Sequence, residues 1–234
     1  MKSLSYQRSK SRLEAYFDRT AADTWARLTS TDPVSRIRRT VRAGREEMQR
    51  TLLEWLPDDL SGRRVLDAGC GTGSLAVLAA SRGASVVAID LSGTLVGLAR
   101  ARAEEGPWAS SIDFRVGDML EAARERFDFV LAMDSLIHYE SKDLVEMVKG
   151  LSADGARRTL FTFAPKTPLL AAMHLAGRVA GKLLGGDRAP FIAPVSERHI
   201  RKRLFQAIPG ASLGRTKRVQ RGFYTSQAVE VLPS

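Results

Sequence analysis

The chain has 234 residues, enough for one large α/β domain or for one domain with an added segment. The formal net charge of +10, from 36 Lys and Arg against 26 Asp and Glu, suits an anionic partner such as nucleic acid, an acidic membrane surface or an acidic small molecule, or serves solubility alone. A single cysteine excludes an intrachain disulfide and favours a reducing cytosol, and neither a signal peptide nor an apolar run of roughly 18 residues for a membrane span is expected.

The first predicted element is a helix over residues 11–28. Leu13 and Phe17 fall near one face at helical spacing, with Tyr16 and Trp25 close by. These aromatic residues are candidates for the wall of a pocket, although an ordinary core would use them equally well.

A second helix is predicted over residues 32–56, where Asp32-Pro33 is typical of a helix start. The pattern then breaks at "PDDLSGR". We therefore expect an N-terminal helical extension, residues 1–56, followed by the main domain, residues 57–234.

From residue 63 onward, short apolar strands alternate with helices, which is typical of βαβ units and a parallel sheet. The five strands are expected at residues 63–69, 85–92, 112–119, 127–134 and 159–165. This cofactor half of the domain would cover residues 63–165.

Three further parts follow Pro165. Residues 166–195 are expected to form a helical cap and substrate-side elements. A helix opens at Ser196, and the runs 212–221 and 222–232 read as a closing antiparallel pair. The sequence thus predicts an α/β fold with a mostly parallel seven-stranded sheet and helices on both faces.

The run "VLDAGCGTGSL" carries a glycine loop after the first strand. A phosphate loop would need Lys and then Ser or Thr after its last glycine, but Ser74-Leu75 follow Gly73. A dinucleotide loop needs glycines at its first, third and sixth positions, whereas here they stand at Gly69, Gly71 and Gly73. Both alternatives therefore fail.

Acidic residues follow or end three successive strands. Asp67 precedes the glycines, at a helix N-terminus that would otherwise attract a phosphate, and so suits a ligand with positive charge. Asp90 ends the second strand, as an acceptor for ribose hydroxyls should. Asp118 follows the third strand and could accept from an adenine amino group.

This combination resembles the class I S-adenosylmethionine-dependent methyltransferases, with a Rossmann-like fold. The resemblance runs from about Val65 to Pro165. It implies that the glycine loop approaches the methionine portion of S-adenosylmethionine, and that the ribose and adenine lie against the second and third strands. The implied cofactor-binding residues are Asp67, Gly69, Cys70, Gly71, Gly73, Asp90, Leu91, Asp118 and Met119.

Residues outside this loop determine which acceptor is methylated, since methyl transfer depends largely on alignment of the acceptor with the methyl group. The run "MDSLIHYE" after the fourth strand lacks the Asn/Asp-Pro-Pro-aromatic pattern of DNA amino-methyltransferases, so no nucleic-acid substrate is expected. His138 in this run is the candidate catalytic residue, as an orienting donor or a base. The scattered histidines and one cysteine predict no metal site.

Arginines on the second helix provide another indication. Arg38, Arg42 and Arg45 share a face, and arginine binds carboxylates in a bidentate manner. A solvated helix surface is the plainer interpretation. A dicarboxylic substrate would use such groups beside an apolar pocket.

Four runs together resemble the magnesium protoporphyrin IX O-methyltransferases of (bacterio)chlorophyll synthesis. They are "AYFDRTAADTWARL", "VSRIRRTVRAGREEM", "VLDAGCGTGSLAVLAASRGASVVAIDLS" and "MDSLIHY". The resemblance implies methylation of one propionate of magnesium protoporphyrin IX to its monomethyl ester. The open alternatives are a methyltransferase for another apolar acid or quinone precursor, and a noncatalytic porphyrin- or cofactor-binding subunit.

The same resemblance suggests where a flat macrocycle would bind and which partners it implies. Tyr16, Phe17, Trp25, Arg38 and Arg42 are the expected substrate contacts, together with a helix over 168–184 that either caps the pocket or lies on an anionic membrane. The porphyrin-binding subunit of magnesium chelatase is an implied partner, because the product of one would be handed to the other. A cytoplasmic location is expected, with peripheral contact at the inner or photosynthetic membrane.

Overall fold

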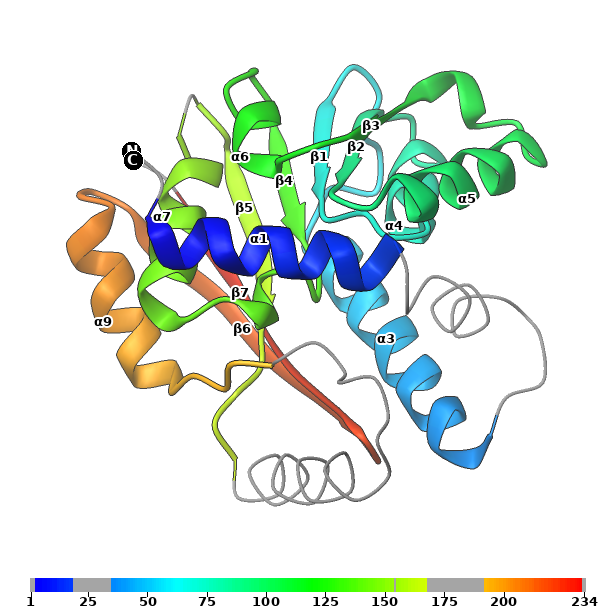
Figure 1. Ribbon diagram of the computed structural model, residues 1–234. Coiled ribbons are helices and arrows are strands. Elements are labelled where there is room, and N and C mark those ends of the chain that lie inside the picture. The colour runs from blue at the N-terminus through cyan, green and yellow to red at the C-terminus, as the bar shows by residue number, and fades with distance from the viewer. Residues whose placement is uncertain (1–2, 19–34, 154, 168–191, 233–234) are drawn as a thin grey trace.

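Seven strands form one sheet in the order β3-β2-β1-β4-β5-β7-β6 (Figure 1). The computed structural model describes residues 3–18, 35–153, 155–167 and 192–232. The strands are β1 Arg64–Ala68, β2 Ser85–Asp90, β3 Ile112–Val116, β4 Phe129–Ala132, β5 Arg158–Phe163, β6 Ser212–Arg221 and β7 Tyr224–Leu232.

Strands β1 to β5 are parallel, whereas β7 enters antiparallel between β5 and β6. The prediction of a mostly parallel seven-stranded sheet is confirmed. In a parallel sheet the carboxyl ends of the strands meet at one edge, and ligands bind there. The acids at the ends of β1 and β2 and the turn after β4 are therefore brought together.

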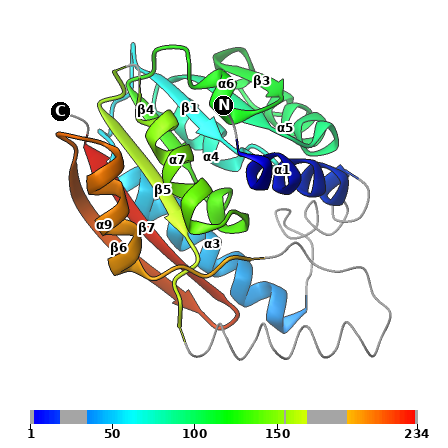
Figure 2. The ribbon, with the colours of Figure 1, turned by 60° about the vertical axis from the view of Figure 1, so that its left-hand side comes forward.

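Helices cover both faces of the sheet (Figure 2). Alternate residues of each strand point to opposite faces, so Leu66 joins one core cluster and Val65 the other. One cluster includes residues of α1, α6, α7 and α9, and the second those of α3, α4 and α5. The helices are α1 Leu4–Tyr16, α3 Arg36–Glu54, α4 Ser74–Ala80, α5 Gly93–Glu104, α6 Met119–Ala122, α7 Ser141–Leu151 and α9 Glu197–Ala207.

Helix α1 begins earlier than the sequence predicts. The apolar pattern indicates a helix from residue 11, but Ser3 caps α1 by accepting from the Tyr6 N–H, and the helix starts at Leu4. Its first half is polar apart from Leu4, which is exposed, and Tyr6, which is buried. Because a single buried aromatic gives no periodicity, the pattern becomes visible only near Leu13.

Helix α3 begins at Arg36, after the cap Ser35, whose hydroxyl accepts from the Arg38 N–H; the predicted start at Asp32-Pro33 is thus wrong by a few residues. Within α3, Gly44 lies directly against β7. A Cβ placed on Gly44 would come within 2.4 Å of Cδ1 in the Tyr224 ring. The missing side chain lets the helix approach the sheet closely.

The predicted closing elements are confirmed, with α9 starting after Ser196 and β6 and β7 pairing antiparallel. The cap expected at 168–184 lies outside the described residues. None of the helices in the described ranges combines the length and apolarity needed to cross a bilayer.

We predict that Gly44→Ala lowers the free energy of unfolding by about 1–3 kcal/mol, because the new methyl group overlaps the Tyr224 ring. Gly97→Ala is the matched control, since Gly97 is a helical glycine with open space at its Cβ position. That variant should gain about 0.5–1 kcal/mol from helix propensity. Urea denaturation of both variants measures the difference, and equal stabilisation by both would contradict the close approach.

Candidate active site

The glycine loop joins β1 to α4 with three left-handed residues. Gly69, Gly71 and Gly73 have φ of 84°, 54° and 77°, a region that residues with a side chain rarely adopt. The backbone N–H groups of Gly69 and Cys70 donate to the Ile89 carbonyl, at 2.8 and 3.0 Å. The loop is thereby fixed to the end of β2.

At two of these glycines, neighbouring side chains leave no room for a Cβ atom. A Cβ on Gly69 would come within 2.3 Å of the Ser135 Cβ, and one on Gly73 within 2.9 Å of the Ala99 Cβ. At Gly71 a Cβ would meet nothing within 4 Å. Gly71 lines a pocket, so its open side is where a ligand can approach the backbone.

Two buried acids flank this loop. Asp90 accepts from the backbone N–H of Gly71 at 2.9 Å and of Ser92 at 3.0 Å. Asp67 is 2% exposed, and its Oδ2 has no hydrogen-bond partner among the described residues. Burial, reinforced by the charge of Asp90, raises the pKa of Asp67 to about 7. Burial also raises the pKa of Asp90.

An orphaned carboxylate oxygen beside an open glycine cradle fits a ligand that carries an ammonium group and hydroxyls. A cation next to Asp67 would supply the charge that the buried carboxylate lacks. Gly69, Gly71 and Asp90 line the pocket and fit the amino acid and ribose portions of S-adenosylmethionine. Asp67 and Gly73 lie outside the lining, so a contact of Asp67 with the ammonium group stays a prediction.

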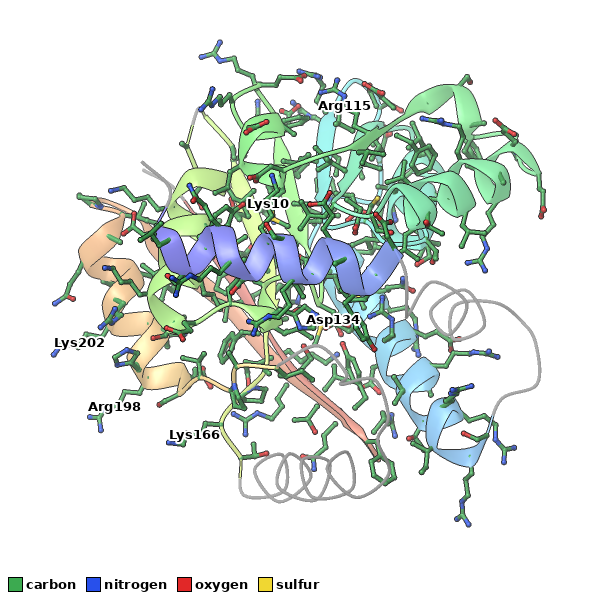
Figure 3. The ribbon with its side chains drawn as sticks, in the orientation of Figure 1. Lys10, Arg115, Asp134, Lys166, Arg198 and Lys202 are labelled. Carbon is green, nitrogen blue, oxygen red and sulfur yellow. The ribbon has the colours of Figure 1, made fainter. Side chains whose placement is uncertain are left out.

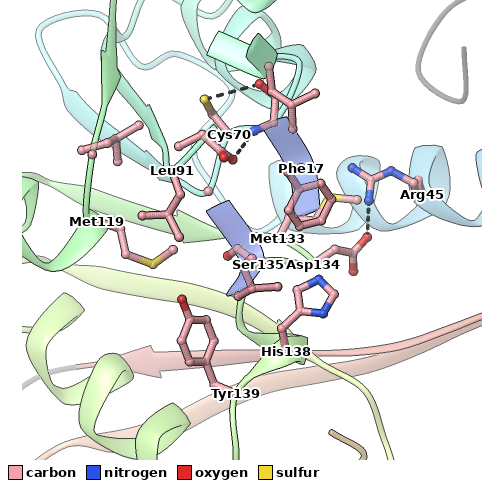
Figure 4. Close-up of a pocket in the computed structure, with 17 residues that line it drawn as sticks. Phe17, Arg45, Cys70, Leu91, Met119, Met133, Asp134, Ser135, His138 and Tyr139 are labelled. Carbon is pink, nitrogen blue, oxygen red and sulfur yellow. Dashed lines mark hydrogen bonds and ion pairs between the residues drawn. The ribbon is translucent and has the colours of Figure 1, made fainter. Parts of the chain in front are cut away.

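A pocket lies beside the loop, at the carboxyl ends of β1, β2 and β4 (Figure 4). Most of its wall is apolar. The lining residues are Leu13, Phe17, Arg45, Gly69, Cys70, Gly71, Ile89, Asp90, Leu91, Leu95, Gly117, Met119, Met133, Asp134, Ser135, His138 and Tyr139.

Asp118 lies beside this pocket rather than in its lining. Its Oδ1 accepts from the Tyr6 hydroxyl at 2.6 Å and from the Leu120 N–H at 3.0 Å, and its Oδ2 lies 3.4 Å from Lys10 Nζ. The carboxylate thus ties α1 to the start of α6. A contact between Asp118 and adenine stays a prediction, whereas the neighbouring Met119 does line the pocket.

Cys70 lines the pocket, but burial and the charges of Asp67 and Asp90 raise the pKa of its thiol. A thiol that resists ionisation is a poor nucleophile. Cys70 is therefore a small wall residue of the loop.

His138 lies in a 3-10 turn, η3 Leu136–His138, that follows β4. It is 9% exposed, lines the pocket and meets the Phe17 ring edge-on, with centroids 5.9 Å apart. The structure thus brings together two residues that the sequence singled out separately. Phe17 belongs to the N-terminal segment and His138 to the turn after β4.

The other predicted substrate contacts lie elsewhere. Tyr16 meets Phe17 edge-on at 5.3 Å but is not part of the pocket lining. Arg38 is exposed and Arg42 half-buried on α3, and neither lines the pocket. Trp25 lies outside the described residues. Their roles toward a substrate stay predictions.

Sequence reasoning missed the charged pair at the pocket wall. Arg45 Nη1 lies 2.7 Å from Asp134 Oδ2, and both residues line the pocket (Figure 4). Arg45 shares the predicted arginine face, but nothing in the sequence indicates how far along α3 the pocket lies. Asp134 stands in the quoted run "MDSLIHYE" and could have been noticed as an acid that ends the predicted fourth strand.

Two family models match the chain. The model described as "Magnesium-protoporphyrin IX methyltransferase C-terminus" matches residues 132–233. The model described as "Methyltransferase domain" matches residues 65–154. The first covers the turn with His138 and the closing strands, and the second covers the glycine loop and its acids.

Similar proteins extend over nearly the whole chain. Magnesium-protoporphyrin O-methyltransferase of Rhodobacter capsulatus is 43% identical over 229 residues, covering 97% of this chain and 98% of that one. The protein of the same name from Synechocystis is 31% identical and covers 94% of each chain. The crystal structure of magnesium protoporphyrin IX methyltransferase from Synechocystis with bound SAH aligns with a TM-score of 0.82 at 32% identity, covering 96% of this chain and 100% of that one.

We predict that Asp67→Asn stabilises the unliganded protein at alkaline pH. The pKa of Asp67 is about 7 in the folded protein but near 4 in the unfolded chain. Between about pH 4 and pH 7 the folded protein therefore holds a proton on Asp67 that the unfolded chain has lost. Stability is therefore lost as the pH rises from about 4 to about 7, and the neutral amide escapes this loss. Thermal unfolding should show a gain on the order of a few kcal/mol at pH 8 and little change near pH 4.

Asp58→Asn is the control, because Asp58 is fully exposed and should show no such dependence. A gain for Asp67→Asn that is the same at both pH values would contradict the buried, proton-binding carboxyl group.

Proposed function

The chain belongs to the family of magnesium-protoporphyrin IX methyltransferases, and we propose that it esterifies one propionate carboxylate of magnesium protoporphyrin IX to give the monomethyl ester in bacteriochlorophyll synthesis. It is an S-adenosylmethionine-dependent methyltransferase that acts on magnesium protoporphyrin IX. The observation that carries this assignment is 43% identity to the Rhodobacter capsulatus enzyme over almost the full length of both chains.

S-adenosylmethionine, when bound, supplies an electrophilic methyl group that the carboxylate oxygen attacks, while the carbon–sulfur electron pair stays on sulfur. The chain's own part is to bind and align. The glycine loop and Asp90 hold the ligand against the ends of β1 and β2, and Asp67 faces its ammonium group. Since a carboxylic acid of this type is ionised at neutral pH, no strong base is required.

His138 is placed to orient the carboxylate toward the glycine loop. It lies in the turn after β4, which also carries Ser135, and Ser135 touches Gly69. The Phe17 ring covers His138 from the N-terminal segment and keeps water from this corner of the pocket. Alignment in a water-poor pocket is the source of catalysis that this geometry supports.

The broad wall for the macrocycle is proposed on the N-terminal side. Phe17 supplies part of it, and we assign Tyr16, Trp25, Arg38 and Arg42 to its outer part on the basis of the sequence. In this proposal residues 1–56 form the substrate-side extension of the methyltransferase domain at 57–234. The segment 166–195 would complete the pocket as a cap.

A turnover assay with S-adenosylmethionine and magnesium protoporphyrin IX tests the proposed function. Mass spectrometry should detect the monomethyl ester and S-adenosylhomocysteine in equal amounts. Absence of the ester with porphyrin still bound would favour a porphyrin-binding subunit. Methylation of a quinone precursor or another apolar acid in place of the porphyrin would favour the alternative substrate class.

We predict that His138→Ala lowers turnover by about 10- to 100-fold, because the carboxylate loses its orienting partner. The affinity for S-adenosylhomocysteine, measured by calorimetry, should change less than about twofold, since no contact of the glycine loop is removed. His199→Ala, at an exposed position of α9, is the control. If His138→Ala keeps its turnover within about twofold of the parent, His138 is structural.

For the partners, we propose peripheral contact with an anionic membrane through α9, in a cytoplasmic location. Arg198, Arg201, Lys202 and Phe205 share one face of α9, opposite the buried Ile200 and Leu204. Figure 3 shows Arg198, Lys202 and the nearby Lys166 pointing outward. Phe205 is 53% exposed, so cations surround an aromatic side chain that can enter a lipid interface.

We predict that the double variant Arg198→Gln/Lys202→Gln binds vesicles of phosphatidylglycerol and phosphatidylcholine about 30-fold more weakly, since each of the two surface cations contributes about 1 kcal/mol. Arg124→Gln/Arg126→Gln is the control, because both side chains are exposed on the loop before β4. Vesicle flotation measures binding. An equal loss of vesicle binding in both double variants would indicate that binding depends on net charge alone and would contradict a contact through α9.

The porphyrin-binding subunit of magnesium chelatase is proposed as the donor of the substrate. A flat apolar macrocycle dissolves poorly, so direct transfer between proteins would avoid its release into water. The two proteins should co-purify in the presence of porphyrin. Porphyrin transfer should be lost when a membrane impermeable to proteins separates them, and undiminished transfer would contradict this proposal.

A further inference from the structure

We propose that Arg45 binds a carboxylate of the substrate and that Asp134 is the positioning residue that fixes Arg45 and the turn carrying His138. This inference rests on the proposed function in one respect: it takes the substrate to be a porphyrin with carboxylate groups.

Arg45 supplies positive charge to the pocket wall. Among the described lining residues it is the one arginine or lysine, and Asp90 and Asp134 are the acids. Its side chain is 17% exposed, which removes much of the competition from water. An anionic group that enters the pocket therefore meets its strongest attraction at Arg45, whose planar fork matches a carboxylate.

Donors from the protein itself occupy the hydrogen-bond acceptor positions of the Asp134 carboxylate. Its carboxylate accepts from Arg45 at 2.7 Å, from the Tyr224 hydroxyl at 3.1 Å, from Ser226 at 3.1 Å and from Thr162 at 3.2 Å. A carboxylate offers about four lone-pair directions, so these donors occupy it. Asp134 is thus suited to holding its neighbours in place rather than to accepting a proton from the substrate.

The backbone of Asp134 is also constrained. Its φ of 53° is the one positive value among the described residues other than glycine, and its N–H donates to Thr162 Oγ1 at 2.8 Å. Such strain persists where surrounding contacts enforce it. The left-handed residue turns the chain at the end of β4, so that Ser135 meets Gly69 and η3 brings His138 to the pocket.

Four donor side chains from three elements therefore converge on one carboxylate. Arg45 comes from α3, Thr162 from β5, and Tyr224 and Ser226 from β7. Gly44, next to Arg45, lets α3 lie against Tyr224, so the guanidinium reaches Asp134 from a helix that is held close to the sheet. The network joins the group that attracts the substrate to the turn that aligns it.

Porphyrin binding in the presence of S-adenosylhomocysteine provides the test. Magnesium protoporphyrin IX, with two carboxylates, is compared with its dimethyl ester, which has none, by fluorescence titration. The parent protein should prefer the diacid, and Arg45→Gln should weaken diacid binding by about tenfold or more while leaving the diester unaffected. Arg45→Lys should recover part of the preference, because it keeps the charge but lacks the fork.

Asp134→Asn keeps the size of the side chain and removes its charge. It should lose the preference for the diacid and lower kcat as well, because both Arg45 and the His138 turn lose their anchor. The double variant Arg45→Gln/Asp134→Asn should prefer the diacid over the dimethyl ester no less than either single variant does, since the two residues act as one unit. Arg50→Gln, at an exposed position of the same helix, should retain the preference.

Circular dichroism and an unchanged affinity for S-adenosylhomocysteine would show that each variant is folded. Should Asp134→Asn fail to fold, Tyr224→Phe and Ser226→Ala each remove one donor to Asp134 and should reduce the preference in smaller steps. Undiminished preference for the diacid in Arg45→Gln would overturn the inference while leaving the methyltransferase assignment intact. Failure of the parent protein to bind or methylate the porphyrin would instead overturn the proposed function.

Discussion

The contact between Gly69 and Ser135 is the constraint on which the site depends. The glycine loop follows β1 and the Ser135 turn follows β4, and these strands are neighbours in the sheet. A Cβ at Gly69 would lie 2.3 Å from the Ser135 Cβ, so the two loops meet without room for a side chain. Ser135 also donates to the Ala68 carbonyl at 2.8 Å. The glycine loop and the turn after β4 are therefore one packed unit.

Much of this unit could be predicted from the sequence, because it is built from local βαβ units. Glycine spacing and acids at strand ends are properties of short segments, and the parallel sheet brings those segments to one edge. The sequence singles out Asp67, Asp90 and His138 in this way, and Asp90 and His138 do line the pocket. The electrostatic state of Asp67 was not predictable, since its raised pKa results from burial among residues that are distant in the sequence.

Contacts between distant segments account for what the sequence did not indicate. Arg45 and Asp134 are 89 residues apart, and Tyr6 and Asp118 are 112 apart. Helical periodicity places Arg38, Arg42 and Arg45 on one face, but only the docking of α3 against β7 decides which of them reaches the pocket. Likewise, a polar helix that buries Tyr6 gives no pattern by which its start could be recognised, so the partner of Asp118 was missed.

Because the Asp134 carboxylate depends on donors that come later in the chain, it affects the order in which the protein folds. Tyr224 and Ser226 follow Asp134 by 90 and 92 residues. During synthesis, the strands next to the glycine loop can pair well before β7 has emerged, but Asp134 then lacks two of its donors. An ionised carboxylate with incomplete partners resists burial. The turn after β4 is thus expected to reach its final conformation only when β7 inserts between β5 and β6, which makes a competent pocket a late product of folding.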